Sequence, residues 1–217
     1  FAVALELMNL PQVKTKFLET LNKEQIKAVT IENESALILA GAGSGKTKVL
    51  TSRISWLIHN QITNPTGLLA VTFTNKAAKE MLMRVTDQLP IHTRGMWVGT
   101  FHGLCHRLLR AHWQDANLPE NFQILDSEDQ YRTIRRTIRA MMLDESQYPP
   151  KEAQWYINAQ KDKGLRPENI NDEGDVTTAQ MIQIYKIYQQ TCERSGAVDF
   201  AELLLRTYEL FNEKESI

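Results

Sequence analysis

Short apolar runs alternate with amphipathic segments through the first half of the chain. The apolar runs occupy residues 35–39, 68–73 and 96–100, and each has the length of a buried parallel strand. Apolar side chains recur at helical spacing in the segments 22–29, 47–59, 75–89 and 101–113. This alternation predicts an α/β fold, with an open parallel sheet flanked by helices and joined by right-handed crossovers.

The pattern changes after about residue 114, where helical periodicity prevails and little strand signal remains. Helices are predicted over residues 127–142, 151–161, 177–194 and 198–211. Asn22 is the expected N-cap of the first helix, and either Asp126 or Ser127 caps the helix that starts near residue 127. The second half therefore reads as a helical insertion or subdomain attached to an α/β core.

Composition excludes few classes of protein. Hydrophobic residues make up 42% and charged residues 24% of the 217 residues, as in ordinary soluble domains. No apolar run approaches the roughly 18–20 residues that a membrane helix needs. The apolar start, Phe1–Leu10, contains Glu6 and no basic leader. We interpret it as a packed helix or an appended segment rather than a signal peptide.

Charge and cysteine content add modest information. Residues 1–110 carry 13 Lys and Arg against 7 Asp and Glu, whereas residues 111–217 carry 12 against 19. A basic first half fits a surface that binds a polyanion, although a solvated surface would give the same count.

Cys105 and Cys192 are too few and too far apart for a disulfide framework. They are expected to be reduced thiols in a cytosolic protein.

A glycine-rich segment carries the strongest chemical signal. It lies between the apolar run 35–39 and the helical segment 47–59, and it consists of Ala40, Gly41, Ala42, Gly43, Ser44, Gly45, Lys46 and Thr47. The phosphate-loop pattern is Gly or Ala, four further residues, and Gly-Lys-Ser/Thr, placed between a strand and a helix. The segment therefore predicts binding of a nucleoside triphosphate, namely ATP with Mg²⁺.

Each residue type in this loop has a physical reason. Glycines let the backbone N–H groups approach the phosphates closely, and the helix that begins near Gly45 directs its positive dipole end at the anion. Lys46 brings a positive charge to the β- and γ-phosphates, and the Thr47 hydroxyl is a ligand for Mg²⁺, so both are the candidate catalytic residues. The alternative is a turn that contains Gly-Lys-Thr by chance, against which the flanking strand and helix argue.

Four blocks of sequence, in order along the chain, carry a family resemblance. They are residues 21–47 (beginning LNKEQIKAV), 70–81 (AVTFTNKAAKEM), 97–110 (WVGTFHGLCHRLLR) and 198–204 (VDFAELL). They resemble the corresponding motifs of UvrD/Rep/PcrA-type superfamily 1 DNA helicases. The intervening segments NFQILDSEDQ and QKDKGLRPENI are similar to the UvrD subgroup of that family.

The resemblance implies an ATP-dependent helicase that moves 3′ to 5′ on single-stranded DNA in nucleotide excision and mismatch repair. It implies a P-loop RecA-like domain over residues 21–113, an all-helical inserted subdomain over 114–196, and a return to the first domain over 197–217. Residues 1–20 stay unassigned. The implied partners are single-stranded DNA, DNA junctions, ATP and repair proteins, in the cytoplasm and without a membrane.

Two further nucleotide contacts follow from the resemblance. Gln25 matches the glutamine that reads adenine, because a carboxamide can pair with a donor and an acceptor on the base edge. The alternative for Gln25 is an exposed helix residue. Lys48 lies where many relatives have an arginine beside the adenine. A lysine lacks the planar fork and stacking surface of arginine, which puts that contact in doubt.

The resemblance also assigns DNA contacts at the ends of two predicted strands. The assigned residues are Phe73, Thr74, Asn75, Lys76, Thr100, Phe101 and His102. An exposed aromatic can stack on a base, and hydroxyls at a helix start can hold a phosphate.

These assignments have structural alternatives, because Phe73 can be a core residue and His102 a histidine with ordinary partners. Arg107 and Arg110 are either phosphate contacts or part of a solvated helix face. The tryptophans, Trp113 and Trp155, are expected to be packing residues.

The sequence shows no Asp-Glu pair after an apolar strand, and so no Walker B motif. The chain is thus expected to be an N-terminal fragment that ends before Walker B, binds nucleotide weakly and does not hydrolyse it. Alternatives are a Rep-type helicase, the helicase part of a repair nuclease complex, and a stand-alone binding module. A P-loop kinase or transporter ATPase would lack the TFTNKAA and GTFH segments.

Overall fold

The structure, a computed structural model, describes residues 16–32 and 34–214. Phe1–Leu10, interpreted above as a packed helix or an appended segment, lies outside these residues. The chain divides into two compact units, the first ending at Phe101 and the second beginning at His102. Each unit is described by itself.

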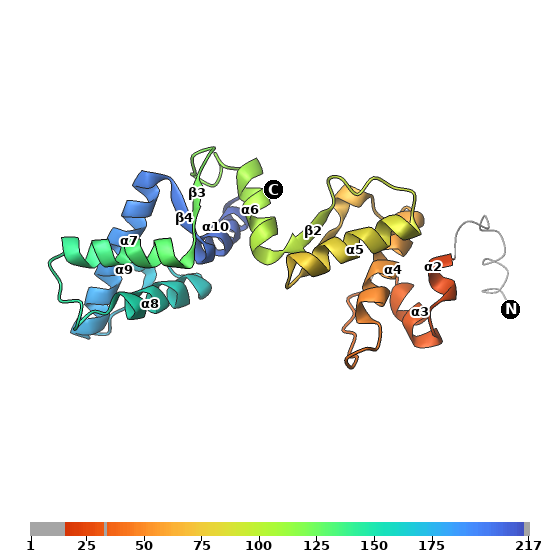
Figure 1. The fold of residues 1–217 in the computed structure, drawn as a ribbon, viewed down its shortest axis with the longest axis horizontal. Coiled ribbons are helices and arrows are strands. Elements are labelled where there is room, and N and C mark those ends of the chain that lie inside the picture. Colours follow the sequence, from red (N-terminus) through yellow and green to blue (C-terminus); the bar gives the residue numbers. More distant parts are fainter. Residues whose placement is uncertain (1–15, 33, 215–217) are drawn as a thin grey trace. The chain divides into compact units, whose positions relative to one another are not determined.

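The first unit alternates helices with short strands (Figure 1). Its described elements are α2 (Lys16–Glu19), α3 (Lys23–Val29), α4 (Lys46–His59), the 3-10 turn η2 (Pro65–Gly67), β1 (Leu69–Thr72), α5 (Asn75–Gln88) and β2 (Trp97–Thr100). The helices predicted over 22–29, 47–59 and 75–89 are confirmed to within one residue, as are the strands predicted over 68–73 and 96–100.

Side-chain caps explain where two of these helices begin. The Asn22 side chain accepts a hydrogen bond from the Gln25 backbone N–H, and the Gln25 side chain accepts one from the Asn22 N–H. This reciprocal capping box confirms Asn22 as the N-cap of α3. At α5, the Thr74 side chain accepts from the Ala77 N–H. Such caps satisfy donors that the first helical turn leaves unpaired.

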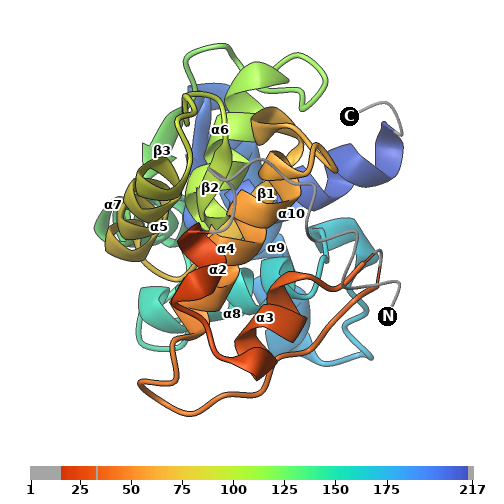
Figure 2. The same ribbon diagram turned by 90° about the vertical axis from the view of Figure 1, so that its right-hand side faces the viewer.

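A small parallel sheet and two helices form the core of this unit. Strand β1 pairs in parallel with β2, with Leu69 opposite Trp97 and Thr72 opposite Thr100. The side chains buried between the sheet, α4 and α5 are Ile54, Ala70, Met81, Val85 and Met96. Burial of each large apolar side chain contributes about 1.5–3 kcal/mol. Helix α3 packs against α4 (Figure 2).

The strand expected over residues 35–39 is not present in this structure. These five residues have no strand assignment and are exposed, with Leu37 at 85% and Leu39 at 86% of full side-chain exposure. An apolar run becomes a buried strand only when neighbouring strands pair with its backbone. In the described part of the first unit, β1 and β2 pair with each other alone. The apolar run therefore lacks the hydrogen-bonding partner that its pattern anticipates.

The second unit is mostly helical. Its described elements are α6 (Phe101–Ala111, which starts at the boundary), β3 (Gln123–Leu125), α7 (Ser127–Ala140), α8 (Pro150–Asp162), the 3-10 turn η3 (Pro167–Asn169), α9 (Val176–Ser195), β4 (Ala197–Asp199) and α10 (Phe200–Glu213). The predicted helices are confirmed with shifts of one or two residues. Asp126, not Ser127, is the N-cap of α7, because its carboxylate accepts from the N–H groups of Glu128 and Asp129.

An all-helical region over 114–196 is contradicted by one strand pair. Strands β3 and β4 run parallel, with Gln123 opposite Ala197 and Leu125 opposite Asp199. Figure 1 shows them side by side. Each strand has three residues, which is too short for a period of two to emerge from the sequence. The pairing brings the two ends of the helical region, α7–α9, together.

Buried aromatic and branched side chains hold the second unit together. The helices α7, α8 and α9 share a core that contains Ile134, Ile138, Ile157, Ile184, Tyr185 and Tyr188. Trp113 packs partly buried against a second core cluster around Leu109 and Phe122, as expected. Trp155 is 62% exposed, so its interpretation as a packing residue is wrong. Among the described residues, no helix is long and apolar enough to span a membrane.

Candidate phosphate-binding site

The glycine-rich loop leads directly into helix α4. Gly45 is the N-cap of α4 and has a left-handed backbone with φ 83° and no side-chain cap hydrogen bond. Gly43 also has a positive φ, 75°. A Cβ atom added at Gly41 or Gly43 would meet no heavy atom within 4 Å. Backbone N–H groups at the start of α4 are thus accessible to an anion, on the positive end of a 14-residue helix.

Hydrogen bonds within the loop hold the Lys46 side chain against the loop backbone. The Lys46 Nζ atom donates to the carbonyl oxygens of Ala40 at 2.8 Å and Gly41 at 2.6 Å. The Ser44 hydroxyl donates to the same Gly41 oxygen at 2.7 Å. Ala42 and Thr47 are exposed beside these residues. An ammonium, a hydroxyl and helix N–H groups are a donor set that suits a phosphate with a divalent cation.

Gln25 contacts the glycine loop from helix α3, whereas Lys48 contacts the chain just after α2. The Gln25 Nε2 atom donates to the Ser44 carbonyl oxygen at 3.1 Å. The Lys48 Nζ atom donates to the Thr20 carbonyl oxygen at 2.6 Å, just after α2. Both residues that the sequence predicts beside the adenine, Gln25 and Lys48, therefore make hydrogen bonds within the protein.

The first predicted DNA contacts lie where β1 ends and α5 begins. Phe73 is 98% exposed, so a core role for it is wrong. Thr74 caps α5, and Thr72 donates from its hydroxyl to the Thr74 carbonyl oxygen at 3.0 Å. Asn75 and Lys76 are exposed on the first turn of α5. The segment presents an aromatic ring, a helix start and a lysine to solvent.

The second predicted DNA segment starts at the same edge of the sheet. Because Thr72 is opposite Thr100 in the parallel register, the ends of β1 and β2 lie next to each other. Phe101 is 59% exposed at the start of α6. His102 belongs to the second unit, where its ring contacts the Phe200 ring edge-to-face at 5.8 Å.

Arg110 has a structural role that neither sequence interpretation anticipated. Its guanidinium donates to the carbonyl oxygens of Glu120 and Phe122, both at 2.6 Å, and lies 3.9 Å from the centre of the Phe122 ring. It also donates to His106. Partial burial, followed by the charge of Arg110, lowers the pKa of His106. Arg107 is exposed on the same helix.

The second unit contains a buried ionic cluster that no sequence pattern predicted. Lys161 donates to Asp199 at 2.7 Å and contacts Glu202 at 2.9 Å, and the three side chains are at most 6% exposed. Arg166 and Arg206 also pair with Glu202. Arg166 pairs with Glu209 as well. The only sequence signal was the acidic pair within VDFAELL, three residues apart at a helix start.

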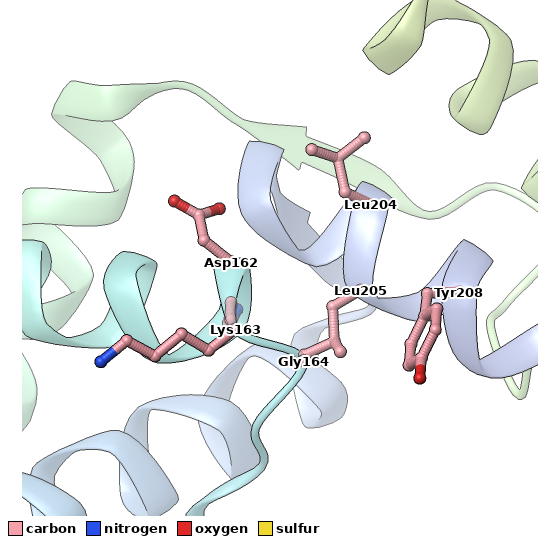
Figure 3. Close-up of a pocket in the computed structure, with 7 residues that line it drawn as sticks. Asp162, Lys163, Gly164, Leu204, Leu205 and Tyr208 are labelled. Carbon is pink, nitrogen blue, oxygen red and sulfur yellow. The ribbon is translucent and has the colours of Figure 1, made fainter.

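A cavity of about 450 Å³ lies beside this cluster. Figure 3 shows its lining from the end of α8 and from α10, with Lys163 and Tyr208 at its sides. Gly164 there has φ 77°, and a Cβ at that position would lie 3.7 Å from the Tyr208 ring. The cavity is separate from the phosphate loop in sequence and belongs to the second unit.

The Asp144-Glu145 pair follows helix α7 rather than a strand, and Glu145 is bound by Arg135 and Arg139. Within residues 16–32 and 34–214, no group of three or more His, Cys, Asp or Glu side chains could hold a metal ion.

Most of the chain, including the glycine loop, is similar to known helicases. The profile of the UvrD/REP helicase N-terminal domain matches residues 21–217. The chain is 55% identical over 200 residues to DNA helicase II of Salmonella typhimurium and of Escherichia coli, covering 92% of this chain and 28% of each relative. It is 37% identical over 195 residues to the ATP-dependent DNA helicase PcrA of Staphylococcus epidermidis, covering 89% of this chain and 27% of PcrA. The chain thus spans just over a quarter of the length of these relatives.

Proposed function

Because the chain belongs to the UvrD/REP helicase family, we propose that it is the nucleotide-binding and DNA-contacting part of an ATP-dependent DNA helicase. The single observation that carries this proposal is the glycine loop that runs into α4 with Gly45 as its left-handed N-cap. Family membership supports ATP as the ligand, since matched relatives are named as helicases and PcrA as ATP-dependent.

Each loop residue has a proposed role in nucleotide binding. The backbone of Ala40–Gly45 and the start of α4 cradle the phosphates, and the Lys46 ammonium moves from its two carbonyl contacts to the β- and γ-phosphates. Thr47 offers its hydroxyl to Mg²⁺, which neutralises phosphate charge when bound. Gln25 contacts the adenine edge. Lys48 contributes less to base binding than an arginine would, because it lacks a stacking plane.

We also propose the domain organisation of the family for this chain. In that arrangement, residues 21–113 and 197–217 belong to one RecA-like domain, and residues 114–196 form an insertion. The pairing of β3 with β4 supports this, because it joins the chain entering α7–α9 to the chain leaving them.

The proposed DNA surface is the shared end of β1 and β2. Phe73 and Phe101 are exposed there, and Thr74, Asn75, Lys76 and Thr100 are their neighbours along the chain. Aromatic rings bind single-stranded DNA by stacking, and lysines and hydroxyls bind its phosphates. His102, the next residue in the chain, is a further proposed DNA contact.

The wider cellular role follows from the family alone. We propose 3′-to-5′ movement on single-stranded DNA, recognition of DNA junctions, and work with repair proteins in nucleotide excision and mismatch repair in the cytoplasm. The 217 residues alone should bind ATP weakly and not hydrolyse it, because hydrolysis requires an acidic pair that holds Mg²⁺ and positions water.

Lys46→Ala tests nucleotide binding. We expect it to weaken binding of a fluorescent ATP analogue with Mg²⁺ at least tenfold, because the variant loses the ammonium that contacts the phosphates. Fluorescence anisotropy titration of both proteins measures this. Lys27→Ala, which removes an exposed lysine from α3, is the matched control and should bind like the parent. Equal binding by Lys46→Ala and the parent would contradict the proposal.

Phe73→Ala tests the DNA surface. We expect about tenfold weaker binding of a thymidine oligonucleotide at fixed low salt, because base stacking on an aromatic contributes about 1–3 kcal/mol per base. Stability should not change, since the ring is 98% exposed. Met83→Ala removes another exposed apolar side chain, 66% exposed on α5, and should leave DNA binding unchanged. A loss of affinity shared by both variants would argue against a stacking role for Phe73.

A further inference from the structure

The Gln25 carboxamide bridges helix α3 and the phosphate loop. Its Oε1 atom accepts from the Asn22 backbone N–H at 3.0 Å, which fixes the plane of the amide at the start of α3. Its Nε2 atom donates to the Ser44 carbonyl oxygen at 3.1 Å, 19 residues further along the chain. One side chain thus ties the end of the loop to a capped helix.

The contact lies at the residue where the loop becomes a helix. A Cβ atom at Gly45 would lie 3.1 Å from Gln25 Nε2 and 3.9 Å from the Lys48 Cβ atom. The amide therefore packs directly against the Gly45 backbone. Gly45 also has a left-handed backbone, with φ 83°, which a glycine adopts without strain.

Holding the Ser44 carbonyl has a consequence for the next N–H group. In a trans peptide, the C=O of one residue and the N–H of the following residue point to opposite sides. A Ser44 carbonyl directed at Gln25 therefore turns the Gly45 N–H away from α3. The N–H groups of such loops are the groups that bind phosphate oxygens, so the orientation of this peptide matters to phosphate affinity.

We propose that Gln25 is a positioning residue for the phosphate loop, acting on phosphate affinity through the Ser44–Gly45 peptide as well as on the base. This inference rests on the proposed function of the loop. It is compatible with adenine contact, because a carboxamide has a second N–H and a second lone pair. A positioning role differs from adenine contact in one respect: Gln25 would then also affect the affinity for ligands that have no base.

Inorganic tripolyphosphate with Mg²⁺ is the probe that separates the two roles. We expect Gln25→Met in the 217-residue chain to weaken tripolyphosphate binding about fivefold, the order expected for one neutral hydrogen bond. ATP binding should weaken at least as much. Isothermal titration calorimetry measures both ligands. Gln147→Met, the same change at an exposed glutamine of the second unit, is the matched control and should have no effect.

A second variant distinguishes loop positioning from loss of the α3 cap. Asn22→Ala removes the side-chain cap of α3 but keeps the backbone N–H that holds Gln25 Oε1. We expect it to lower the thermal midpoint and to leave tripolyphosphate affinity within twofold of the parent. If Asn22→Ala weakens tripolyphosphate binding as much as Gln25→Met does, the effect comes from helix stability and the inference is wrong.

The remaining outcomes are equally decisive. Weakened ATP binding with unchanged tripolyphosphate binding would make Gln25 a base contact only and overturn its positioning role. Unchanged binding of both ligands would also overturn it. Failure of the proposed function would look different: the parent itself would then bind tripolyphosphate no better than Lys46→Ala does, and the inference would fall with it.

Discussion

Lys161→Met is expected to lower the free energy of unfolding of the second unit by about 3–5 kcal/mol, the usual effect of removing one partner from a buried ion pair. The Lys161 side chain is 3% exposed, and its Nζ atom lies within 2.9 Å of oxygens on both Asp199 and Glu202. Methionine fills a similar volume but leaves Asp199 without its cation. The Tyr188 hydroxyl would still donate to Asp199, which compensates only in part for the lost charge.

The measurement must report on the second unit alone. Hydrogen exchange of peptides from α8, α9 and α10 at increasing urea gives the local unfolding free energy. Lys163→Met is the matched control, because Lys163 is exposed two residues away, and it should change stability by less than about 0.5 kcal/mol. A Lys161→Met effect as small as that of the control would mean that the cluster contributes little to stability.

Local structure in the first unit was largely predictable from the sequence, because its signals are local. Asn22 was predicted as a side-chain cap, because a cap is recognised from residues within one helical turn. The helix after the glycine loop was equally clear, since Gly45 and Lys46 belong to a pattern with a known context. The sequence was misleading at residues 35–39, where burial depends on a backbone partner that a local pattern cannot supply.

The buried cluster could not be predicted, because its charged residues lie far apart in the sequence. Lys161 and Asp199 are 38 residues apart, and a lysine near the end of an amphipathic helix is most often exposed. Only the β3–β4 pairing and the packing of α8 on α10 bring these charges together. Sequence resemblance identified both segments, KDKGLR and VDFAELL, as parts of one family. It did not show that they contact each other.

The same cluster predicts how the second unit responds to acid. Although burial alone would raise the pKa of Glu202, the charges of Lys161, Arg166 and Arg206 outweigh it, and the pKa lies well below its ordinary value of 4.5. A depressed carboxylate pKa stabilises the folded state fully above the unfolded value, and that stability is lost as pH falls. Burial alone would lower the pKa of Lys161, but the charges of Glu202 and Asp199 raise it above its ordinary value of 10.5. The contribution of Lys161 therefore persists until strongly alkaline pH.

The contribution of Glu202 and Lys161 to the free energy of unfolding of the second unit should therefore be constant between about pH 5 and 10. It should fall by on the order of 3 kcal/mol as pH drops from 5 toward 2.

Glu202→Gln separates this effect from general acid unfolding. The variant should be less stable than the parent at pH 7. The difference should shrink steadily below pH 4.5, because the unfolded parent binds a proton at Glu202 there whereas the folded parent keeps the carboxylate charged. Glu213→Gln, at an exposed position of α10, should follow the parent at every pH. A difference between Glu202→Gln and the parent that stays constant from pH 7 to pH 3 would show that Glu202 acts through packing, and that its charge does not stabilise the fold.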